Sequence, residues 1–318
     1  MIKRREFIRQ SLILGGGVLS GASLFKNRSP EFTDLPTEFS DPLSEPDVVT
    51  ILYTNDTHGR IDPFPQTARE HAGLGGISRR ASLVKRIRQE SPNSLLLDAG
   101  DAFYGSPWFT LYGGKRHFEL MSLMGYDAMA LGEHEFHHGL EGFAEAAGAA
   151  DFPFLCANYR VTGTAMEPFV QPYLIREVGG VRFGIFGLGV ALHELVPPEK
   201  RGEVRVGEPI SRADTVVRFL KEQRHCDYII CLSHLGYHYE DSRPDDRKLA
   251  ASIEGLDLII GGHTHTFMDQ PEMIQSADGG QTLVTQVGHS GIRLGRIDLK
   301  ISGERRVEGL EAQQYTMR

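Results

Sequence analysis

The sequence is poor in cysteine, with three in 318 residues: Cys156, Cys226 and Cys231. We place Cys226 and Cys231 in one predicted strand, where their odd separation points the two side chains to opposite faces, about 16 Å apart. A disulfide needs Cα atoms within about 7 Å, so these two cannot pair. Cys156 remains a possible partner for either, but buried free thiols are expected. A small disulfide-stapled scaffold is therefore excluded.

The chain also has too few basic residues for a protein that wraps a nucleic-acid polymer. The chain has 34 Lys and Arg against 42 Asp and Glu, a formal net charge of −8. The first 25 residues carry Lys3, Arg4, Arg5 and Arg9 against Glu6, a net of +3, so the remainder stands at −8 − 3 = −11. This charge balance excludes a protein that binds a nucleic-acid polymer through a broad basic surface. An anionic substrate would have to be attracted by something else, and bound metal ions are the obvious candidate.

The N-terminus lacks an apolar run long enough for a membrane span. Residues 11–25 form an apolar stretch of about 15 residues interrupted by glycine, whereas a transmembrane helix needs about 20. The pair Arg4-Arg5, followed by Phe7, resembles a twin-arginine export signal, which carries folded proteins. We therefore expect residues 1–25 to be an export signal, with Ser20-Gly-Ala22 as a weak cleavage site. The alternative is a basic tail on a cytosolic protein.

The expected location is periplasmic or extracellular, with no stable membrane span after processing. Four prolines punctuate residues 26–46, which we interpret as a linker. Residues 47–318 are then one domain. In it, short apolar runs predict strands at 48–53, 94–97, 128–131, 154–156, 181–186, 228–232, 256–260, 282–287 and 295–301. Amphipathic patterns predict helices at 77–89, 118–124, 140–149, 212–225 and 247–253. This alternation predicts an α/β fold, but periodicity does not say whether the strands form one sheet or two.

Carboxylate and imidazole side chains recur where predicted strands end. In open α/β sheets the carboxyl ends of the strands are where ligands bind. Each motif alone is weak, since Asp-x-His is more often a surface turn. Five such motifs at successive strand ends indicate one metal or catalytic site. The residues concerned are Asp56, His58, Asp101, Glu133, His134, His234, His263 and His265.

The order of these motifs resembles the calcineurin-like metallophosphoesterases, and within them the 5′-nucleotidase, UDP-sugar hydrolase and 2′,3′-cyclic phosphodiesterase branch. The resemblance runs from about residue 48 to residue 300. It rests on Leu52-Tyr-Thr-Asn-Asp-Thr-His58, Gly100-Asp-Ala-Phe-Tyr-Gly-Ser106, Phe154-Leu-Cys-Ala-Asn158, Gly261-Gly-His-Thr-His265 and Leu294-Gly-Arg-Ile-Asp298. It implies a four-layer αββα sandwich in a single domain, with a dinuclear metal site at the strand ends.

The resemblance also implies roles for individual residues. Asp56, His58 and His265 would hold one divalent metal ion, Glu133, His234 and His263 a second, and Asp101 would bridge both. Mixed oxygen and nitrogen ligands suit Mn, Zn, Fe or Co. The implied reaction is phosphoester hydrolysis by in-line attack of a hydroxide held by the two ions. His134 would lie beside the leaving-group oxygen, to stabilise or protonate it.

One motif departs from the family pattern Gly-Asn-His-Glu-Phe-Asp, since this chain has Gly132-Glu-His-Glu-Phe-His137. Glu133 replaces the metal-binding Asn, and His137 replaces the Asp that orients His134. With two divalent ions, Asp56, Asp101 and Glu133 leave a charge of +4 − 3 = +1. We therefore expect an altered substrate preference. The alternatives are a metal-binding pseudoenzyme or a split enzyme that needs a separate nucleotide-binding chain.

Several further interpretations are weaker. His134-Glu-Phe-His-His138 spells a zinc-protease motif, but that motif needs a helix, and this one follows a predicted strand and turn. Glu135 and His138 are therefore expected to be loop residues. His289 is a candidate for supporting the site or contacting phosphate. Gly184–Gly189 lacks the spacing of a dinucleotide loop.

The substrate is expected to be a small phosphoester, with a nucleotide as the first choice. The sequence does not distinguish nucleotides from UDP-sugars, cyclic phosphates or a sulfur ester. Longer members of the branch stack the nucleobase on a C-terminal domain. This chain ends soon after its last predicted strand, so we expect that domain to be supplied, if at all, by a separate chain.

Overall fold

The computed structural model describes residues 47–276, 279–303 and 305–318. The predicted export signal and linker, residues 1–46, lie outside these ranges, and the proposed domain boundaries stay a prediction. Within the described ranges, no helix combines the length and the apolar character needed to cross a membrane.

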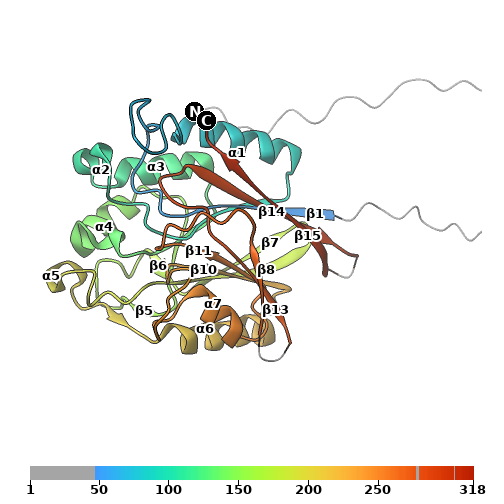
Figure 1. Cartoon of the computed structure of the whole chain (residues 1–318). Coiled ribbons are helices and arrows are strands. Elements are labelled where there is room, and N and C mark those ends of the chain that lie inside the picture. Colours follow the sequence, from blue (N-terminus) through green and yellow to red (C-terminus); the bar gives the residue numbers. More distant parts are fainter. Residues whose placement is uncertain (1–46, 277–278, 304) are drawn as a thin grey trace, which may run out of the picture. The chain divides into compact units, whose positions relative to one another are not determined.

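Two large sheets form the centre of the fold (Figure 1). The first has the order β15-β14-β1-β2-β3-β4-β6. Strands β1, β2, β3, β4 and β6 run parallel, whereas β14 and β15 are antiparallel additions at one edge. Their bounds are β1 Asp47–Thr54, β2 Ser94–Asp98, β3 Ala128–Ala130, β4 Phe154–Leu155, β6 Val170–Gln171, β14 Arg293–Ile301 and β15 Val307–Thr316.

The second sheet has the order β12-β13-β11-β10-β8-β7, with parallel inner strands and antiparallel strands at both edges. Its strands are β7 Tyr173–Val178, β8 Val181–Leu188, β10 Tyr228–Ser233, β11 Leu258–Gly261, β12 Glu272–Gln275 and β13 Gln281–Thr285. A small antiparallel pair, β5 Tyr159–Arg160 and β9 Arg205–Val206, lies outside both sheets.

Helices cover the outer face of each sheet (Figure 1). The first sheet is covered by α1 Ile77–Glu90, α3 Lys115–Met124 and α4 Gly139–Ala147, and the second by α6 Pro209–Arg218 and α7 Asp246–Ser252. Shorter turns are α2 Pro107–Tyr112, the 3-10 turn η1 His134–Phe136, α5 Pro198–Arg201 and the π-turn η2 Phe219–Gln223. The layer order is helices, sheet, sheet, helices, which confirms the predicted αββα sandwich.

Successive side chains of the inner strands point to opposite faces of their sheet. Each sheet therefore packs against the other sheet on one face and against helices on the other. In β1, Ile51 packs into the core between the two sheets, whereas its neighbour Leu52 packs under the helices of the first sheet. Both side chains are fully buried. Parallel strands buried on both faces read as continuous apolar runs, which is why they were visible in the sequence.

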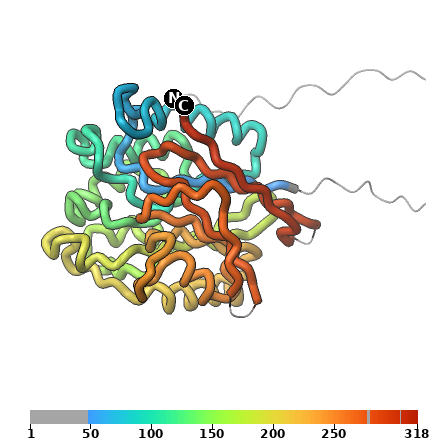
Figure 2. The backbone as a smooth tube through the Cα atoms, viewed as in Figure 1, coloured from blue at the N-terminus to red at the C-terminus, as the bar shows by residue number. Residues whose placement is uncertain are grey.

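All nine predicted strands and all five predicted helices are present, with boundaries shifted by a few residues. The prediction that β14 is the last strand was wrong, because β15 follows it and pairs with it along its length. Figure 2 shows this late part of the chain lying beside the early strand β1. The three cysteines are buried and free, as expected.

Candidate metal centre and active site

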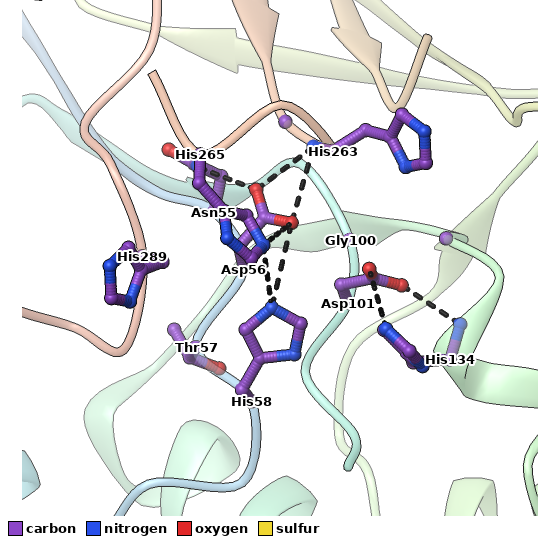
Figure 3. Close-up of polar contacts among 12 residues, drawn as sticks. Asn55, Asp56, Thr57, His58, Gly100, Asp101, His134, His263, His265 and His289 are labelled. Carbon is purple, nitrogen blue, oxygen red and sulfur yellow. Dashed lines mark hydrogen bonds and ion pairs between the residues drawn. The ribbon is translucent and has the colours of Figure 1, made fainter. Parts of the chain in front are cut away.

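Seven candidate ligands meet at the carboxyl ends of strands from both sheets. Loops after β1, β2 and β3 carry Asp56, His58, Asp101 and Glu133, and loops after β10 and β11 carry His234, His263 and His265. Figure 3 shows Asp56 with His58 and His265 around it, and Asp101 with His134 beside it. The structure therefore brings together residues up to 209 positions apart, from Asp56 to His265 (265 − 56).

The first group consists of Asp56, His58 and His265, whose donor atoms lie within 4.8 Å of one another. His265 Nε2 is 3.3 Å from Asp56 Oδ1 and 2.8 Å from His58 Nε2. Asp56 is fully buried, whereas His265 is open to solvent. One carboxylate and two imidazoles around a common point are a donor set for a transition-metal ion.

The second group consists of Asp101, Glu133, His234 and His263. His234 Nε2 lies 3.1 Å from Asp101 Oδ2 and 3.2 Å from Glu133 Oε2, and His263 Nδ1 lies 3.0 Å from Glu133 Oε1. The same His234 nitrogen is 3.9 Å from Asp56 Oδ1, so the two groups adjoin. Asp101 also forms a group with His58 and His134, which places it between the two.

His234 shows that this donor set fits a cation. Its Nδ1 lies 2.7 Å from the carbonyl oxygen of Ala99, so Nδ1 carries a proton, and Nε2 is the nitrogen that faces Asp101 and Glu133. That Nε2 is buried and is not satisfied by a hydrogen bond from any described residue. Beside two carboxylates this nitrogen either carries a proton or, when a metal ion is bound, offers its lone pair to that ion.

The charges around His234 also favour a cation at this position. Burial alone would lower the pKa of His234, but the carboxylates of Asp101, Glu133 and Asp56 outweigh it and raise the pKa well above its usual range. The site therefore favours a positive charge at this imidazole, and a metal ion supplies one. The roles of individual ligands stay a prediction.

The backbone at these positions is strained. Asp56, His58, Asp101, His263 and His265 all have positive φ, at 49°, 49°, 57°, 71° and 54°. Residues other than glycine seldom adopt this conformation, and such strain gathers at functional sites. At Gly132 a Cβ would lie 2.1 Å from Asp101 Oδ1, so only glycine fits against this carboxylate.

Glu135 is a supporting residue that the sequence analysis missed. It was expected to be a loop residue, but it is fully buried. Its Oε2 accepts hydrogen bonds from the backbone N–H of Asp101 and Gly132, at 3.0 and 2.8 Å, and its Oε1 from those of Ala102 and Phe103, at 2.9 and 3.2 Å. Burial, with the nearby Asp101 carboxylate, raises the pKa of Glu135 to about 8. One side chain thus fixes the loop that carries Asp101.

Two buried amides connect loops of the site: Asn55 joins a loop of the first sheet to one of the second, and Gln286 joins two loops of the second sheet. Asn55 donates through Nδ2 to Asp56 Oδ2 and to the carbonyl of Gly288, both at 2.6 Å, and its Oδ1 accepts from the N–H of Val287 at 2.9 Å. Gln286 donates to the carbonyl of Gly262 at 2.7 Å. The sequence did offer an indication of these roles: Asn55 directly precedes the candidate ligand Asp56, and Gln286 directly follows the apolar strand β13.

His134 lies at the edge of the two groups. Its backbone N–H donates to Asp101 Oδ1 at 2.9 Å, and its Nε2 is 3.8 Å from Asp101 Oδ2. Its Nδ1 is 3.2 Å from Nδ1 of His137. Tyr104 stacks on both rings, with centroids 4.9 Å from His134 and 3.9 Å from His137. His134 to Phe136 form only a single 3-10 turn, so the helical context of a zinc protease is missing.

His289 lies outside the two groups. Its ring centroid is 5.0 Å from that of His265, and its Nδ1 is 2.9 Å from Ser290 Oγ. Burial and the neighbouring histidines lower the pKa of His289 to about 4. A neutral imidazole therefore faces the first group from its far side (Figure 3).

Comparison with known proteins gives a consistent set of similarities. Residues 49–267 match the family model described as calcineurin-like phosphoesterase. The chain is 34% identical over 275 residues to the 5′-nucleotidase of Rattus norvegicus, covering 79% of this chain and 46% of that protein. It is 32% identical over 276 residues to the snake venom 5′-nucleotidase of Gloydius brevicauda, covering 79% and 45%. The chain thus spans about half the length of these relatives.

Among solved structures, a 5′-nucleotidase precursor from Thermus thermophilus matches with a TM-score of 0.75 and 29% identity, over 85% of this chain and 54% of that one. The calcineurin-like phosphoesterase YfkN from Bacillus subtilis matches with a TM-score of 0.69 and 25% identity, over 85% and 91%. Both similarities support the fold described above.

Proposed function

The chain belongs to the calcineurin-like phosphoesterase family, in its 5′-nucleotidase branch, and from this premise we propose that it is an exported phosphoester hydrolase that acts on nucleotides with two divalent metal ions. The observation that carries the proposal is the pair of adjoining donor groups, with Nε2 of the buried His234 facing the carboxylates of the second. Asp56, His58 and His265 would hold one ion, and Glu133, His234 and His263 the other, with Asp101 between. Such ions supply positive charge toward phosphoryl oxygens and lower the pKa of water.

The chain's own residues account for the leaving group. His134 Nδ1 is occupied by His137, so Nε2 is the nitrogen on the side of Asp101. It is therefore the atom that can give a proton to the departing oxygen. The hydrogen bond from the His134 backbone N–H to Asp101 Oδ1 keeps the His134 ring beside the donor groups.

A nucleotide substrate is supported by the relatives, which are named 5′-nucleotidases. The chain has a net charge of −8, so the attraction of phosphate to the site would come from the bound ions. Export is supported by the twin-arginine-like start and would place the enzyme in the periplasm or outside the cell. Replacing both Arg4 and Arg5 with Lys should retain the protein in the cytoplasm, as measured by cell fractionation.

The activity is tested on the purified chain, stripped with a chelator and reloaded with Mn²⁺ or Zn²⁺. Phosphate release is measured from AMP, UMP release from UDP-glucose, the ring-opened 2′- or 3′-AMP from 2′,3′-cyclic AMP, and p-nitrophenol from bis-p-nitrophenyl phosphate. We expect metal-dependent release from AMP, lost in Asp101→Asn. Because Asp101 belongs to the donor groups, this variant should also bind less metal by elemental analysis.

Glu133 favours a second candidate, a metal-binding protein with little turnover. Its carboxylate lies among the second donor group and lowers the charge that a phosphate dianion would meet. Bound metal without hydrolysis of any of the four substrates would support this candidate. Activity that appears only with a separately encoded nucleotide-binding chain would support a split enzyme.

A further inference from the structure

A cavity of about 370 Å³ opens directly beside the second donor group. His263 belongs to both the donor group and the cavity wall, and Leu235, next to His234, lines the cavity as well. A volume of this size is in the range that holds small organic ligands. The cavity therefore continues the candidate active site rather than forming a separate one.

Two exposed apolar side chains line this cavity. Leu195 is 46% exposed and Val206 is 39% exposed, although both are large aliphatic residues. They come from different elements, since Leu195 precedes α5 and Val206 belongs to β9. A single exposed aliphatic residue is ordinary, but two on the wall of one cavity indicate a surface that a ligand covers.

The wall formed by Tyr239 and Arg243 is held in place before any ligand binds. The Arg243 guanidinium lies 4.0 Å from the centroid of the Tyr239 ring, and its Nε donates to both carboxylate oxygens of Asp241 at 3.0 and 2.9 Å. Lys248 Nζ donates to the carbonyl oxygens of Tyr239 and Arg243 at 2.8 and 3.0 Å. A rigid flat wall lowers the entropy cost of binding a flat group.

The charges around the cavity are already engaged by protein groups. The Glu208 carboxylate accepts hydrogen bonds from the backbone N–H of Ile210 and Ser211, Glu194 lies 3.5 Å from Nε2 of His193, and Arg243 is paired with Asp241. An anionic group would therefore find no unpaired Lys or Arg among the lining residues, whereas hydroxyl and amino groups would find the remaining carboxylate lone pairs as acceptors. The cavity thus suits an uncharged ligand with a flat ring and hydrogen-bond donors.

We propose that this cavity binds the nucleoside part of a nucleoside monophosphate, with the base on the Tyr239 and Arg243 wall and against Leu195 and Val206. The proposal rests on the proposed nucleotidase function, because it places the phosphate of the same molecule at the donor groups. The residues that line the cavity offer no unpaired Lys or Arg to a further phosphate on this side, as in dinucleotides and nucleotide-sugars.

The test is binding of adenosine to the full Mn²⁺-loaded chain by isothermal titration calorimetry. Adenosine has no phosphate, so its binding does not depend on hydrolysis. Leu195→Glu, at an exposed position, should raise the Kd for adenosine about tenfold or more. Leu123→Glu is the matched control, since Leu123 is 83% exposed on α3 and lines a different surface, and it should leave the Kd unchanged. Val206→Glu should repeat the effect of Leu195→Glu.

A kinetic comparison separates this proposal from the proposed function. Leu195→Glu should raise the KM for AMP about tenfold and the KM for glycerol phosphate by much less, because glycerol is too small to reach the wall and meets only the added charge. Adenosine binding that is absent in the native chain, or equal in native chain and Leu195→Glu, overturns the cavity assignment. Native adenosine binding that Leu195→Glu weakens, without phosphate release from any substrate, overturns the nucleotidase function instead.

Discussion

At the scale of single residues, Glu133 sets the charge of the candidate metal site. Two divalent ions with Asp56, Asp101 and Glu133 leave +4 − 3 = +1, and Glu133→Asn changes this to +2. A dianionic phosphate should then be attracted more strongly. We expect the KM for AMP to fall about tenfold, equivalent to about 1.4 kcal/mol. The measurement is steady-state phosphate release at constant ionic strength.

Glu133→Asp is the matched control, because it keeps the negative charge while shortening the side chain. Its KM should not fall. If Glu133→Asn leaves the KM for AMP and the rate on bis-p-nitrophenyl phosphate unchanged, the charge of Glu133 does not govern substrate preference.

Tyr104 is predicted to act by positioning His134. It stacks on His134 and His137, and its φ of 66° shows that the backbone is strained to place the ring there. Tyr104→Ala should lower kcat for AMP about tenfold, since a misplaced acid protonates the leaving oxygen less well. p-Nitrophenyl phosphate should be almost unaffected, because p-nitrophenolate leaves without a proton.

Tyr104→Phe keeps the stacked ring and should retain the activity of the native chain on both substrates. An equal loss on AMP and p-nitrophenyl phosphate in Tyr104→Ala would mean that the ring supports the fold of the site rather than proton transfer.

The sequence predicted the donor residues but not their supports, for a physical reason. Asp56, His58 and His263 follow apolar strands directly, so local pattern and the strand-end rule locate them. Glu135 was missed because its partners at 101–103 lie more than 30 residues away, and only the packing of two loops brings them to its carboxylate. Tyr104 was missed because an aromatic residue in a loop carries no periodic signal.

At the scale of elements, the loop after β2 depends on Glu135. Glu135→Gln places an amide NH₂ where a carboxylate oxygen accepts two backbone N–H groups. Donor would then face donor in a buried position, at a cost of about 1–3 kcal/mol. We expect the free energy of unfolding to fall by this amount in urea titration, and metal affinity to fall with it.

Glu145→Gln is a suitable control for Glu135→Gln. Glu145 lies on an exposed part of α4, and the substitution makes the same chemical change at that position. Its stability should stay within about 0.5 kcal/mol of the native chain. Native stability in Glu135→Gln would show that water or a rotated amide replaces the four hydrogen bonds.

Element boundaries show where sequence pattern carries information and where it does not. The inner strands were found because they are buried on both faces and flanked by glycine or polar clusters. Strand β15 was missed because it lies at the sheet edge, where partly exposed Glu and Gln residues dilute the alternation. Its existence follows from pairing with β14 rather than from its own sequence.

At the scale of the whole molecule, the metal ions should link the two sheets. Both donor groups combine residues from loops of the first and second sheets, so bound ions stabilise their packing. At a concentration of 100 Kd, a bound ion adds about 2.7 kcal/mol to the free energy of unfolding. Chelation should therefore lower Tm by about 5–10 °C, measured by calorimetry with and without Mn²⁺.

His234→Ala provides the comparison for metal removal. It deletes a ligand of the second group, so the response of its Tm to Mn²⁺ should be much smaller. A native chain whose Tm does not respond to Mn²⁺, Zn²⁺ or a chelator would contradict a metal role for these groups.

The pairing of β1 with β14 has a consequence for how the protein is made. Asp47 lies opposite Ile301, 301 − 47 = 254 residues later, so β1, which leads into the loop with Asp56 and His58, gains its β14 neighbour only late in synthesis. At about 5–20 residues per second, that strand waits roughly 10–50 s on the ribosome. The last candidate ligand, His265, follows Asp56 by 265 − 56 = 209 residues, so the donor set is complete only after most of the chain has been made. The ions available in the compartment where the chain then folds decide what the site binds.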